Sequence, residues 1–571
     1  MAIEVERGQQ ALSTESDPGA RTLCEAFQAT VALGPDDVAL RTVDASSQLT
    51  FGQYAEQVRQ IAAGLAALGV GRGDTVALMM SNRIEFYPCD TAALHLGATP
   101  FSVYNTSSPE QIAYLFGNAG NRVVFAEAGF IERIRAAVQL GGIDPQVVCI
   151  DGEADGAITL SELIARGEQD SFDFEATWRA VQPDDVLTLI YTSGTTGPPK
   201  GVQTTHANML AQCRAVGQVL PILRGDVITS YLPAAHVADR WASHYNQIVF
   251  GIQVVPVPDA RQIAAALPAV RPTIWGAVPR VFEKLVAALQ AKLPAPPDQL
   301  DPDTLAKIRA QIGLDRARWI IVGAAPMPSA VHEFLLSLGL PVTELYGMSE
   351  TSCVVSVCPP EQARVGTVGK VIPGQELKVA DDGELLIRGP IVMAGYRNDP
   401  ERTAEVIDAD GWRHSGDIVE LDDDGHVRIV DRNKELIINA AGKNMSPANI
   451  EEKLKSASPL IGQAICIGDK RPYNVALLVL DPDAAAAYAQ ANALADASIE
   501  AVAADPGVQR AVADAVQQAN EKLSRVEQIK RFTLLHEEWL PGGEELTPTM
   551  KLKRKPINAK YEAEIEALYG D

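Results

Sequence analysis

The chain has 571 residues, more than one hydrophobic core supports, so we expect at least two domains. Its 49 Lys and Arg residues stand against 73 Asp and Glu, a formal net charge of −24 with a pI near 4.8. Nucleic-acid binding rests on neutralising phosphates, so this acidity argues against a nucleic-acid partner.

Cysteine spacing and the charge-free stretches bear on the compartment. The seven cysteines are scattered, and no second pair accompanies Cys353 and Cys358 to complete a zinc site. We therefore expect free thiols in a reducing compartment. Residues 1–7 lack the basic region and apolar core of a signal peptide, and charge-free stretches such as 241–258 contain polar side chains. We expect a cytoplasmic protein with at most peripheral membrane contact.

The first two thirds of the chain alternate between strand and helix patterns. Residues 1–20 are polar and predict a mobile lead-in. The apolar spacing from Gln53 to Leu68 predicts a helix that ends at Gly69. Short apolar runs predict strands at 75–79, 123–125, 147–150, 186–190 and 319–323. This alternation predicts α/β layers with largely parallel sheets.

The pattern changes after about Gly366. Residues 376–387 read as a hairpin around an Asp-Gly turn, and 421–430 repeat that pattern. The acidic cluster at 422–424 could be a calcium loop, but the Gly and distal Glu of such a loop are absent, so a hairpin turn is the better interpretation. Residues 484–519 are rich in alanine and predict helices.

A glycine-rich loop, Tyr191–Gly201, follows the strand predicted at 186–190. Its three glycines allow close backbone approach to a ligand, while four hydroxyls and a lysine can hold an anion. Pro199 precedes Lys200 and Gly201 follows it, whereas a Walker A loop has Gly before the Lys and Ser or Thr after it. A flexible surface loop rich in turn formers is the alternative. We favour a phosphate-binding loop.

This loop resembles the AMP-binding signature of the adenylate-forming superfamily, which includes acyl-CoA synthetases, luciferases and peptide-synthetase adenylation domains. Further motifs match in the family's order, from about residue 20 to the C-terminus. The resemblance implies a nucleotide-binding role for Thr192, Ser193, Gly194, Thr195, Thr196, Gly197 and Lys200. Among these, Thr192 would also take part in catalysis, and Thr196 would help to hold Mg²⁺.

Two further motifs concern the adenine and the metal. The segment 346–351, Tyr-Gly-Met-Ser-Glu-Thr, resembles the one whose aromatic ring stacks on adenine, whose Thr contacts phosphate and whose Glu holds Mg²⁺. Tyr346, Gly347, Met348 and Thr351 would therefore bind nucleotide, and Glu350 would be catalytic and bind the metal. Gly323, Ala324 and Ala325 resemble the small-residue loop that lines the adenine pocket. A turn with an incidental Glu is the alternative for the first motif.

Asp417 closes a Trp-Arg-His-Ser-Gly-Asp segment that resembles the one whose carboxylate accepts both ribose hydroxyls. Arg432 and Lys434 lie in a segment similar to the family's hinge, where Arg432 would contact ribose and Lys434 would be the pivot. The alternatives are that Asp417 is a simple turn residue and that the charged hinge residues lie on a solvated helix face. The resemblance then implies a lead-in at 1–20, a large domain at 21–431, and a small domain at 432–571 with a hinge near 431–434.

The implied fold class is α/β. The large N-terminal domain would contain layered α/β sheets and a small β-barrel-like subdomain, and the smaller C-terminal α+β domain would be mobile. In that C-terminal domain, Lys551 aligns with the catalytic lysine of the family. Met550 stands where many relatives have Gly, so Lys553 and Lys555 remain alternatives, and a basic surface run is a further one.

The resemblance also implies an acyl and CoA pocket. His236 would shape the acyl pocket, Trp241 would act as an aromatic gate, and Gly442 would allow close approach of the pantetheine arm. A structural role is the alternative for the lone His236. The wording around 346–351 and 442–447 looks most like long-chain fatty acyl-CoA synthetases, including the bubblegum group.

The reaction implied is ATP-dependent activation of a long-chain fatty acid to acyl-AMP, followed by transfer to CoA, with release of pyrophosphate and AMP. ATP, CoA and the fatty acid would be substrates, Mg²⁺ the cofactor, and a dimer one assembly to expect. A fatty acyl-AMP ligase that delivers to a carrier protein is the alternative, although the chain ends soon after the Lys551 motif with no carrier domain. A non-enzymatic nucleotide scaffold is disfavoured because Lys551, Glu350 and Asp417 are all present.

Overall fold

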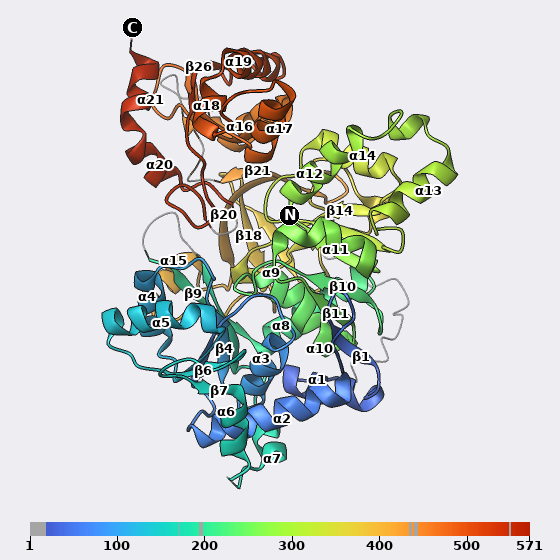
Figure 1. Ribbon diagram of the computed structural model, residues 1–571, viewed down its shortest axis with the longest axis vertical. Coiled ribbons are helices and arrows are strands. Elements are labelled where there is room, and N and C mark those ends of the chain that lie inside the picture. Colours follow the sequence, from blue (N-terminus) through green and yellow to red (C-terminus); the bar gives the residue numbers. More distant parts are fainter. Residues whose placement is uncertain are drawn as a thin grey trace.

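The computed structural model describes residues 19–169, 171–192, 198–432, 435, 437–438, 444–547 and 550–570. Most of the chain forms one large region, and the C-terminal helices and strands lie together at one end of the molecule (Figure 1). This mixed α/β architecture confirms the predicted fold class. Residues 1–18 of the lead-in predicted at 1–20 lie outside the described residues, and the domain limits stay a prediction.

A five-stranded parallel sheet, in the order β4-β3-β5-β6-β7, forms the first layer of the large region. Its strands are β3 (Thr75–Met79), β4 (Thr99–Ser102), β5 (Val123–Ala126), β6 (Gln146–Cys149) and β7 (Ile158–Thr159). Side chains alternate between the faces of a strand, so Val76 and Leu78 enter one core while Ala77 and Met79 enter another. Helices therefore cover both faces of this sheet, as expected for parallel strands.

The first of those cores includes α2 (Phe51–Ala67) and α3 (Phe86–His95), and the second includes α4 (Pro109–Ala119) and α5 (Ala128–Gly141). The helix predicted at 53–68 is confirmed as α2. It begins two residues earlier because Thr50 caps it and forms a capping box with Gln53. The neighbouring helices are α1 (Leu23–Leu33), α6 (Leu160–Gly167) and α7 (Phe174–Arg179).

Two further sheets complete the α/β part of the large region. One has the order β10-β11-β1-β2, and the other is parallel with the order β12-β13-β14. Their strands are β1 (Val38–Arg41), β2 (Gln48–Thr50), β10 (Val227–Ser230), β11 (Gln253–Pro256), β12 (Ile274–Ala277), β13 (Trp319–Val322) and β14 (Val342–Glu344). The helices here are α8 (His206–Val219), α9 (Val237–Asp239), α10 (Asn246–Phe250), α11 (Ile263–Val270), α12 (Pro279–Gln290), α13 (Pro302–Gln311) and α14 (Ser329–Ser337).

Single turns join these elements. The segment η1 (Arg240–Tyr245) is π-helical, and the others are 3₁₀ turns: η2 (Ala260–Gln262), η3 (Pro297–Gln299), η4 (Ser349–Thr351) and η5 (Pro360–Gln362). π-Helical turns are rare and frequently stand at functional sites. The segment η1 carries the predicted gate residue Trp241.

An antiparallel hairpin, β8 (Val186–Thr192) and β9 (Lys200–Thr205), carries the glycine-rich loop. The strand predicted at 186–190 is confirmed and continues for two more residues. The short strand β19 (Gly395–Tyr396) pairs with the other edge of β9. Thr99 and Thr188 fasten β8 to β4, because each donates its hydroxyl to a carbonyl of the other strand's segment.

The hairpins predicted after Gly366 are confirmed. They form an antiparallel sheet in the order β17-β18-β20-β21. Its strands are β17 (Glu376–Val379), β18 (Glu384–Arg388), β20 (Arg413–Leu421) and β21 (Val427–Arg432), with the pair β15 (Ser356–Val357) and β16 (Lys370–Val371) beside them and α15 (Pro400–Val406) between β19 and β20. Asp422 and Asp424 both pair with Arg364, so the acidic cluster is part of a hairpin turn, as predicted.

The C-terminal domain has its own sheet, β24-β25-β26, and its own apolar clusters, made of residues from Ile437 onward. Its elements are β22 (Ile437–Ile438), β23 (Asn444–Met445), α16 (Pro447–Ala457), β24 (Ile461–Ile467), β25 (Asn474–Leu480), α17 (Pro482–Ala491), α18 (Ile499–Ala504), α19 (Pro506–Glu521), β26 (Ile529–Leu535), α20 (Arg554–Lys560) and α21 (Glu562–Tyr569). The helices predicted in 484–519 are confirmed as α17 to α19. Across the described residues, every helix is too short or too polar to cross a membrane.

Candidate functional site

The glycine-rich loop is anchored at both ends by strand pairing, because Thr192 of β8 lies opposite Lys200 of β9. Its central predicted residues, Ser193, Gly194, Thr195, Thr196 and Gly197, lie outside the described residues. A hairpin places the loop at one end of a rigid β-ribbon.

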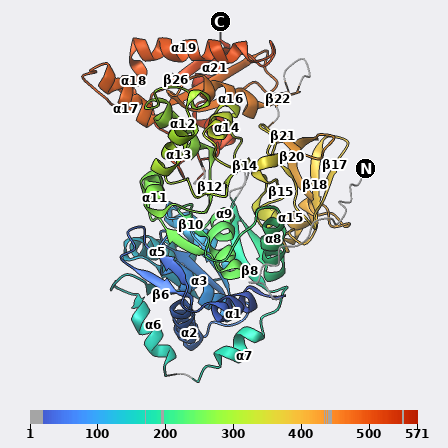
Figure 2. The ribbon, with the colours of Figure 1, turned by 90° about the vertical axis from the view of Figure 1, so that its right-hand side faces the viewer.

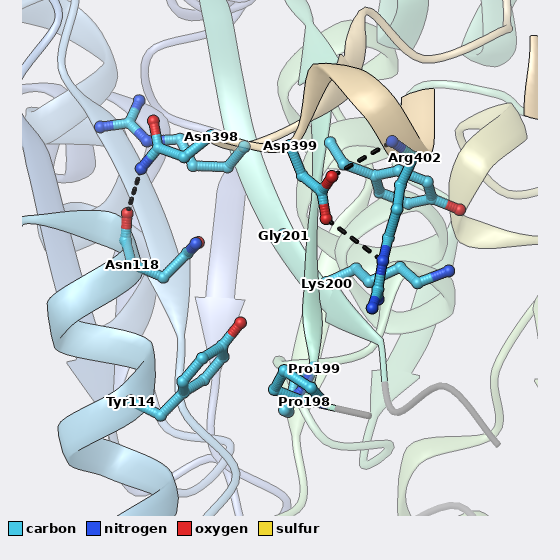
Figure 3. Close-up of a pocket in the computed structure, with 11 residues that line it drawn as sticks. Tyr114, Asn118, Pro198, Pro199, Lys200, Gly201, Asn398, Asp399 and Arg402 are labelled. Atoms are coloured by element: carbon cyan, nitrogen blue, oxygen red, sulfur yellow. Dashed lines mark hydrogen bonds and ion pairs between the residues drawn. The ribbon is translucent and has the colours of Figure 1, made fainter. Parts of the chain in front are cut away.

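A cavity of about 160 Å³ adjoins this loop (Figure 3). Pro198, Pro199 and Lys200 line one wall, and Tyr114 and Asn118 of α4 face them across the opening. The segment from Tyr396 to Arg402 closes the cavity and adds two guanidinium groups, those of Arg397 and Arg402. Three cations against the single carboxylate of Asp399 make this pocket attractive to an anion such as phosphate.

Tyr396 connects the loop to Glu350, a link that the sequence analysis missed. Its hydroxyl donates to Glu350 Oε1 at 2.8 Å, and the ammonium of Lys200 lies 4.9 Å from the centre of its ring. Arg413 Nη2 approaches the same carboxylate oxygen at 3.7 Å. Burial and the charge of Glu350 raise the pKa of Tyr396, so its hydroxyl stays protonated and able to donate. The pairing of β19 with β9 and the hydrogen bond from the Met393 amide to the Glu350 carbonyl bring these residues together.

Thr351, predicted to contact phosphate, is fully buried in η4. Its hydroxyl donates to the carbonyl of Met348 at 3.2 Å and accepts from the Met348 amide at 3.3 Å. The threonine therefore shapes the turn that presents Glu350.

Tyr346 and Asp417, predicted to bind adenine and ribose, lie together. The Tyr346 hydroxyl donates to Asp417 Oδ2 at 2.5 Å. Arg432 faces Asp417 across the β20–β21 ladder, with its Nε 3.5 Å from Asp417 Oδ1. Burial raises the pKa of Asp417, while the Tyr346 hydroxyl and the nearby cations, Arg432 foremost, act in the opposite direction. The carboxylate is thus oriented by two partners at the mouth of the predicted nucleotide site.

The small residues of the predicted adenine pocket stand at closely packed positions. A Cβ on Gly347 would stand 1.6 Å from the carbonyl oxygen of Cys353, and one on Gly323 would stand 2.7 Å from Leu345 Cδ1. Neither position accepts a side chain without a shift of the backbone or of Leu345. Ala324 has a φ of +72°, in the left-handed region, and Ala325 follows it in the loop after β13. These residues keep the ends of β13 and β14 close to Tyr346.

Lys551 directly precedes Leu552, which forms an isolated bridge with Leu546. Its amide donates to the Thr547 hydroxyl at 3.0 Å. Met550, where many relatives have Gly, has a φ of +64° in the left-handed region that favours glycine. Met550 therefore adopts the backbone conformation for which glycine is suited.

The Lys551 ammonium responds to charges of the large region and of the hinge segment. Burial and the positive charge of Arg432 lower its pKa, whereas Asp417, Glu350 and Glu435 raise it. The residue as a whole is exposed, whereas its ammonium group is surrounded by protein atoms. The two alternatives are placed differently. Lys553 donates its Nζ to the carbonyl of Gly543 at 2.7 Å, and Lys555 is an exposed residue of α20. The geometry thus favours Lys551.

His236 and Trp241, predicted for the acyl pocket, differ in their surroundings. His236 accepts the amide of Ala238 at its Nδ1 and begins α9, and burial together with the charge of Lys551 lowers its pKa to about 4. Trp241 is 1% exposed and belongs to the main core of the large region. His236 therefore adjoins the predicted catalytic lysine, while Trp241 packs inside.

A buried ion-pair cluster lies next to Trp241, and sequence reasoning missed it. Arg240 Nη1 and His244 Nε2 lie 2.7 and 2.9 Å from the two oxygens of Asp90, and all three side chains are inaccessible to solvent. Arg240 also donates to the Ser102 hydroxyl at 3.0 Å. Asp90 is 150 residues away from Arg240 in the chain, so no local pattern announces the cluster.

Comparison with known proteins decides the family. The pattern of the AMP-binding enzymes matches residues 27–397, and that of the AMP-binding enzyme C-terminal domain matches 434–571. The chain belongs to this family. The predicted resemblance is confirmed.

Curated relatives of this AMP-binding enzyme align over most of its length. FadD11 of Mycobacterium tuberculosis is 51% identical over 453 residues, covering 73% of this chain and 79% of the relative. The long-chain-fatty-acid–CoA ligase FadD15 of Mycobacterium bovis is 34% identical, covering 92% of both. The long-chain-fatty-acid–CoA ligase ACSBG2 of Xenopus laevis is 31% identical, covering 96% of this chain and 84% of the relative.

Solved structures share the fold. The adenylation domain of a carboxylate reductase from Mycobacterium chelonae superposes with a TM-score of 0.80 at 22% identity, covering 98% of this chain and 92% of that one. O-succinylbenzoate CoA synthetase from Bacillus subtilis, solved with AMP, superposes with a TM-score of 0.72 at 24% identity, covering 93% of this chain and 97% of that one.

Two predicted residues, the hinge residue Lys434 and the pantetheine-pocket residue Gly442, lie outside the described part of this chain.

Proposed function

We propose that this AMP-binding enzyme is a long-chain fatty-acid–CoA ligase, which forms acyl-AMP and pyrophosphate from the acid and ATP and then transfers the acyl group to CoA. The observation that carries this proposal is the similarity to FadD15, a relative named long-chain-fatty-acid–CoA ligase, over 92% of both chains. The ACSBG2 relative bears the same activity in its name and aligns over 96% of this chain.

In the first step, the acid's carboxylate attacks the α-phosphate of ATP, and the α–β phosphoanhydride bond breaks to release pyrophosphate. Neither reactant is strongly activated, so catalysis depends on positioning and on charge stabilisation. Lys551 would neutralise charge between the carboxylate and the α-phosphate. Thr192, Lys200 and the loop between them would hold the β- and γ-phosphates. Asp417 would accept the ribose hydroxyls, with Arg432 beside it.

The residues around Glu350 suit Mg²⁺. Among the described residues, Tyr396 and Arg413 both approach Oε1 of this carboxylate, so Oε2 points to no described donor. Carboxylate and phosphate oxygens are the ligands that Mg²⁺ prefers. Glu350, with Thr196 of the loop, would hold the ion, which would offset negative charge on the phosphates when bound.

In the second step, the thiol of CoA attacks the acyl carbonyl and AMP leaves. Resemblance to the family implies that the small domain rotates about Lys434 for this step and that Gly442 admits the pantetheine arm. His236 and Trp241 would border the acyl group. The alternative, an acyl-AMP ligase serving a carrier protein, is disfavoured because relatives aligned over both domains are named CoA ligases.

We also propose a cytoplasmic enzyme that contacts a membrane peripherally, where long-chain acids reside. Sedimentation of the purified protein with and without lipid vesicles tests that contact and reveals a dimer if one forms.

One experiment tests the activity. The protein is incubated with Mg·ATP and acids from acetate to long-chain, with and without CoA, and the acyl products are identified by mass spectrometry. The proposal expects long-chain acyl-CoA only when CoA is present. Acyl-AMP that accumulates equally with and without CoA would move the protein to the acyl-AMP ligases, and nucleotide binding without any acyl product would indicate a scaffold.

A further inference from the structure

Helix α12 of the large region meets α17 of the small domain through two ion pairs. Lys284 Nζ lies 2.5 Å from Asp483 Oδ2, and Arg280 pairs with Asp481. Both views place α17 directly beside α12, far from the end of the molecule that holds α2 (Figures 1 and 2). Two cations spaced one helical turn apart thus face two carboxylates at the beginning of α17.

This contact is polar and stands apart from the hinge. The apolar cluster to which α12 contributes ends at Val342, and the clusters of the small domain begin at Ile437, so no described cluster joins the two bodies. Beside the hinge, the two bodies also meet where Ser446 contacts Val430 and Asp431. A body held only at its hinge can rotate, and a second point of attachment fixes that rotation.

The two pairs differ in strength. Asp481 is 7% exposed and Arg280 about one third exposed, so their attraction is screened by little water. Lys284 and Asp483 are both mostly exposed, which limits their pair to a modest contribution. The charge of Lys284, and secondarily that of Arg280, lowers the pKa of Asp483, which keeps this carboxylate ionised.

We propose that Arg280 and Lys284 are positioning residues. They hold the small domain in the arrangement in which Lys551 faces Asp417 and Glu350, and they release α17 when the domain rotates for thioester formation. This inference rests on the proposed two-step reaction. It assigns to α12, which carries none of the predicted nucleotide or acyl residues, control over the balance between the two steps.

The populations of the two domain arrangements determine the quantity to measure, which is the ratio of the two half-reaction rates. Each half-reaction rate is proportional to the population of its own domain arrangement, so their ratio follows the equilibrium between the arrangements whichever predominates. Weakening the contact should raise the ratio of thioester formation to adenylation. Loss of an exposed pair shifts such an equilibrium about two- to fivefold, and loss of the more buried Arg280–Asp481 pair about tenfold or more.

The experiment measures both half-reactions separately: pyrophosphate exchange for adenylation, and acyl-CoA formation from supplied acyl-AMP for the second step. Lys284→Glu should raise the ratio two- to fivefold or more, and Lys284→Glu combined with Asp483→Lys should return it to the original value. Arg280→Gln should raise it about tenfold. Asp481 is left unchanged because it also caps α17 by accepting the amide of Ala484.

Arg59→Glu is the matched control. Arg59 is an exposed residue of α2 that, within the described part of the chain, pairs with Glu56 of the same helix, and its reversal changes the net charge as Lys284→Glu does. The control should leave the ratio unchanged. A zero-length carbodiimide cross-link between Lys284 and Asp483, detected by mass spectrometry, reports the contact without using activity. It should form in the unmodified protein and in Arg59→Glu, and be lost in Lys284→Glu.

The outcomes separate two failures. An unmodified protein that catalyses neither half-reaction contradicts the proposed function, and the cross-link then still tests the contact itself. An active protein whose ratio stays constant in Lys284→Glu and Arg280→Gln, or whose charge-swapped double variant stays shifted, overturns the positioning role. Circular dichroism shows whether each variant is folded. If Arg280→Gln does not fold, Lys284→Glu, at an exposed site, carries the test.

Discussion

Asp239 is a buried carboxyl group at the end of α9, just before the π-helical segment. It is 4% exposed, and the Ser230 hydroxyl donates to it at 2.9 Å. Ser243 contributes a second hydroxyl at 3.2 Å from the same oxygen. Burial raises the pKa of Asp239 from 3.8 to about 7, because these hydroxyls and the neighbouring Arg240 compensate only part of the lost hydration.

The sign of the pH effect follows from that raised pKa. The folded protein binds the proton more tightly than the unfolded chain, so the contribution of Asp239 to stability is fully present below pH 3.8. It is lost as the pH rises and stays lost above about pH 7. The loss is about 1.4 kcal/mol per pH unit within that window and about 4 kcal/mol in total.

Asp239→Asn keeps the shape of the side chain and is uncharged at every pH. We expect the variant to gain stability over the unmodified protein by about 1.4 kcal/mol per unit between pH 5 and 6.5, with a plateau above pH 7. Urea unfolding at each pH measures this difference, and the other titrating groups cancel in it. Tryptophan fluorescence reports mainly on the large region, which holds five of the six tryptophans. A difference between the two proteins that does not change with pH would refute the reasoning.

Three more predictions concern the site and its support. Lys551→Ala should slow pyrophosphate exchange about 10²- to 10³-fold while acyl-CoA formation from supplied acyl-AMP is largely retained, and equal loss of both would contradict the assignment. Asp417→Ala should raise the KM for ATP about 10- to 100-fold by removing a charged acceptor for the ribose, and steady-state kinetics with unchanged KM would exclude that role. Arg240→Met should destabilise the protein by about 3–5 kcal/mol because it leaves Asp90 buried without its main partner. Urea unfolding checks this value, and adding Asp90→Asn should cost less than the two single changes summed, whereas strict additivity would mean that the pair does not interact.

Most of the predicted site residues stand in short motifs, so local sequence patterns were enough to predict them. Tyr346, Glu350, Asp417 and Lys551 each stand in a short motif. In the structure, Tyr346 bonds to Asp417, and the charges of Asp417 and Glu350 act on Lys551. The strands and hairpins also followed from sequence, because side-chain alternation and turn residues act over a few positions. Met550 showed the limit of motif reasoning. Because Met550 stands where many relatives have glycine, Lys553 and Lys555 remained alternatives to Lys551 in the sequence analysis. In the structure, Met550 adopts the left-handed backbone conformation that glycine favours.

The sequence by itself determined the family, the α/β class and the residues that carry charge or hydroxyls, since these depend on short motifs and periodicity. Only the tertiary structure decided which of those residues meet. Tyr396 reaches Glu350 through the pairing of β19 with β9, Asp90 reaches Arg240 across 150 residues, and Lys284 reaches Asp483 across 199. Such contacts arise when separate elements pack, and packing over long chain separations leaves no periodic trace in one sequence.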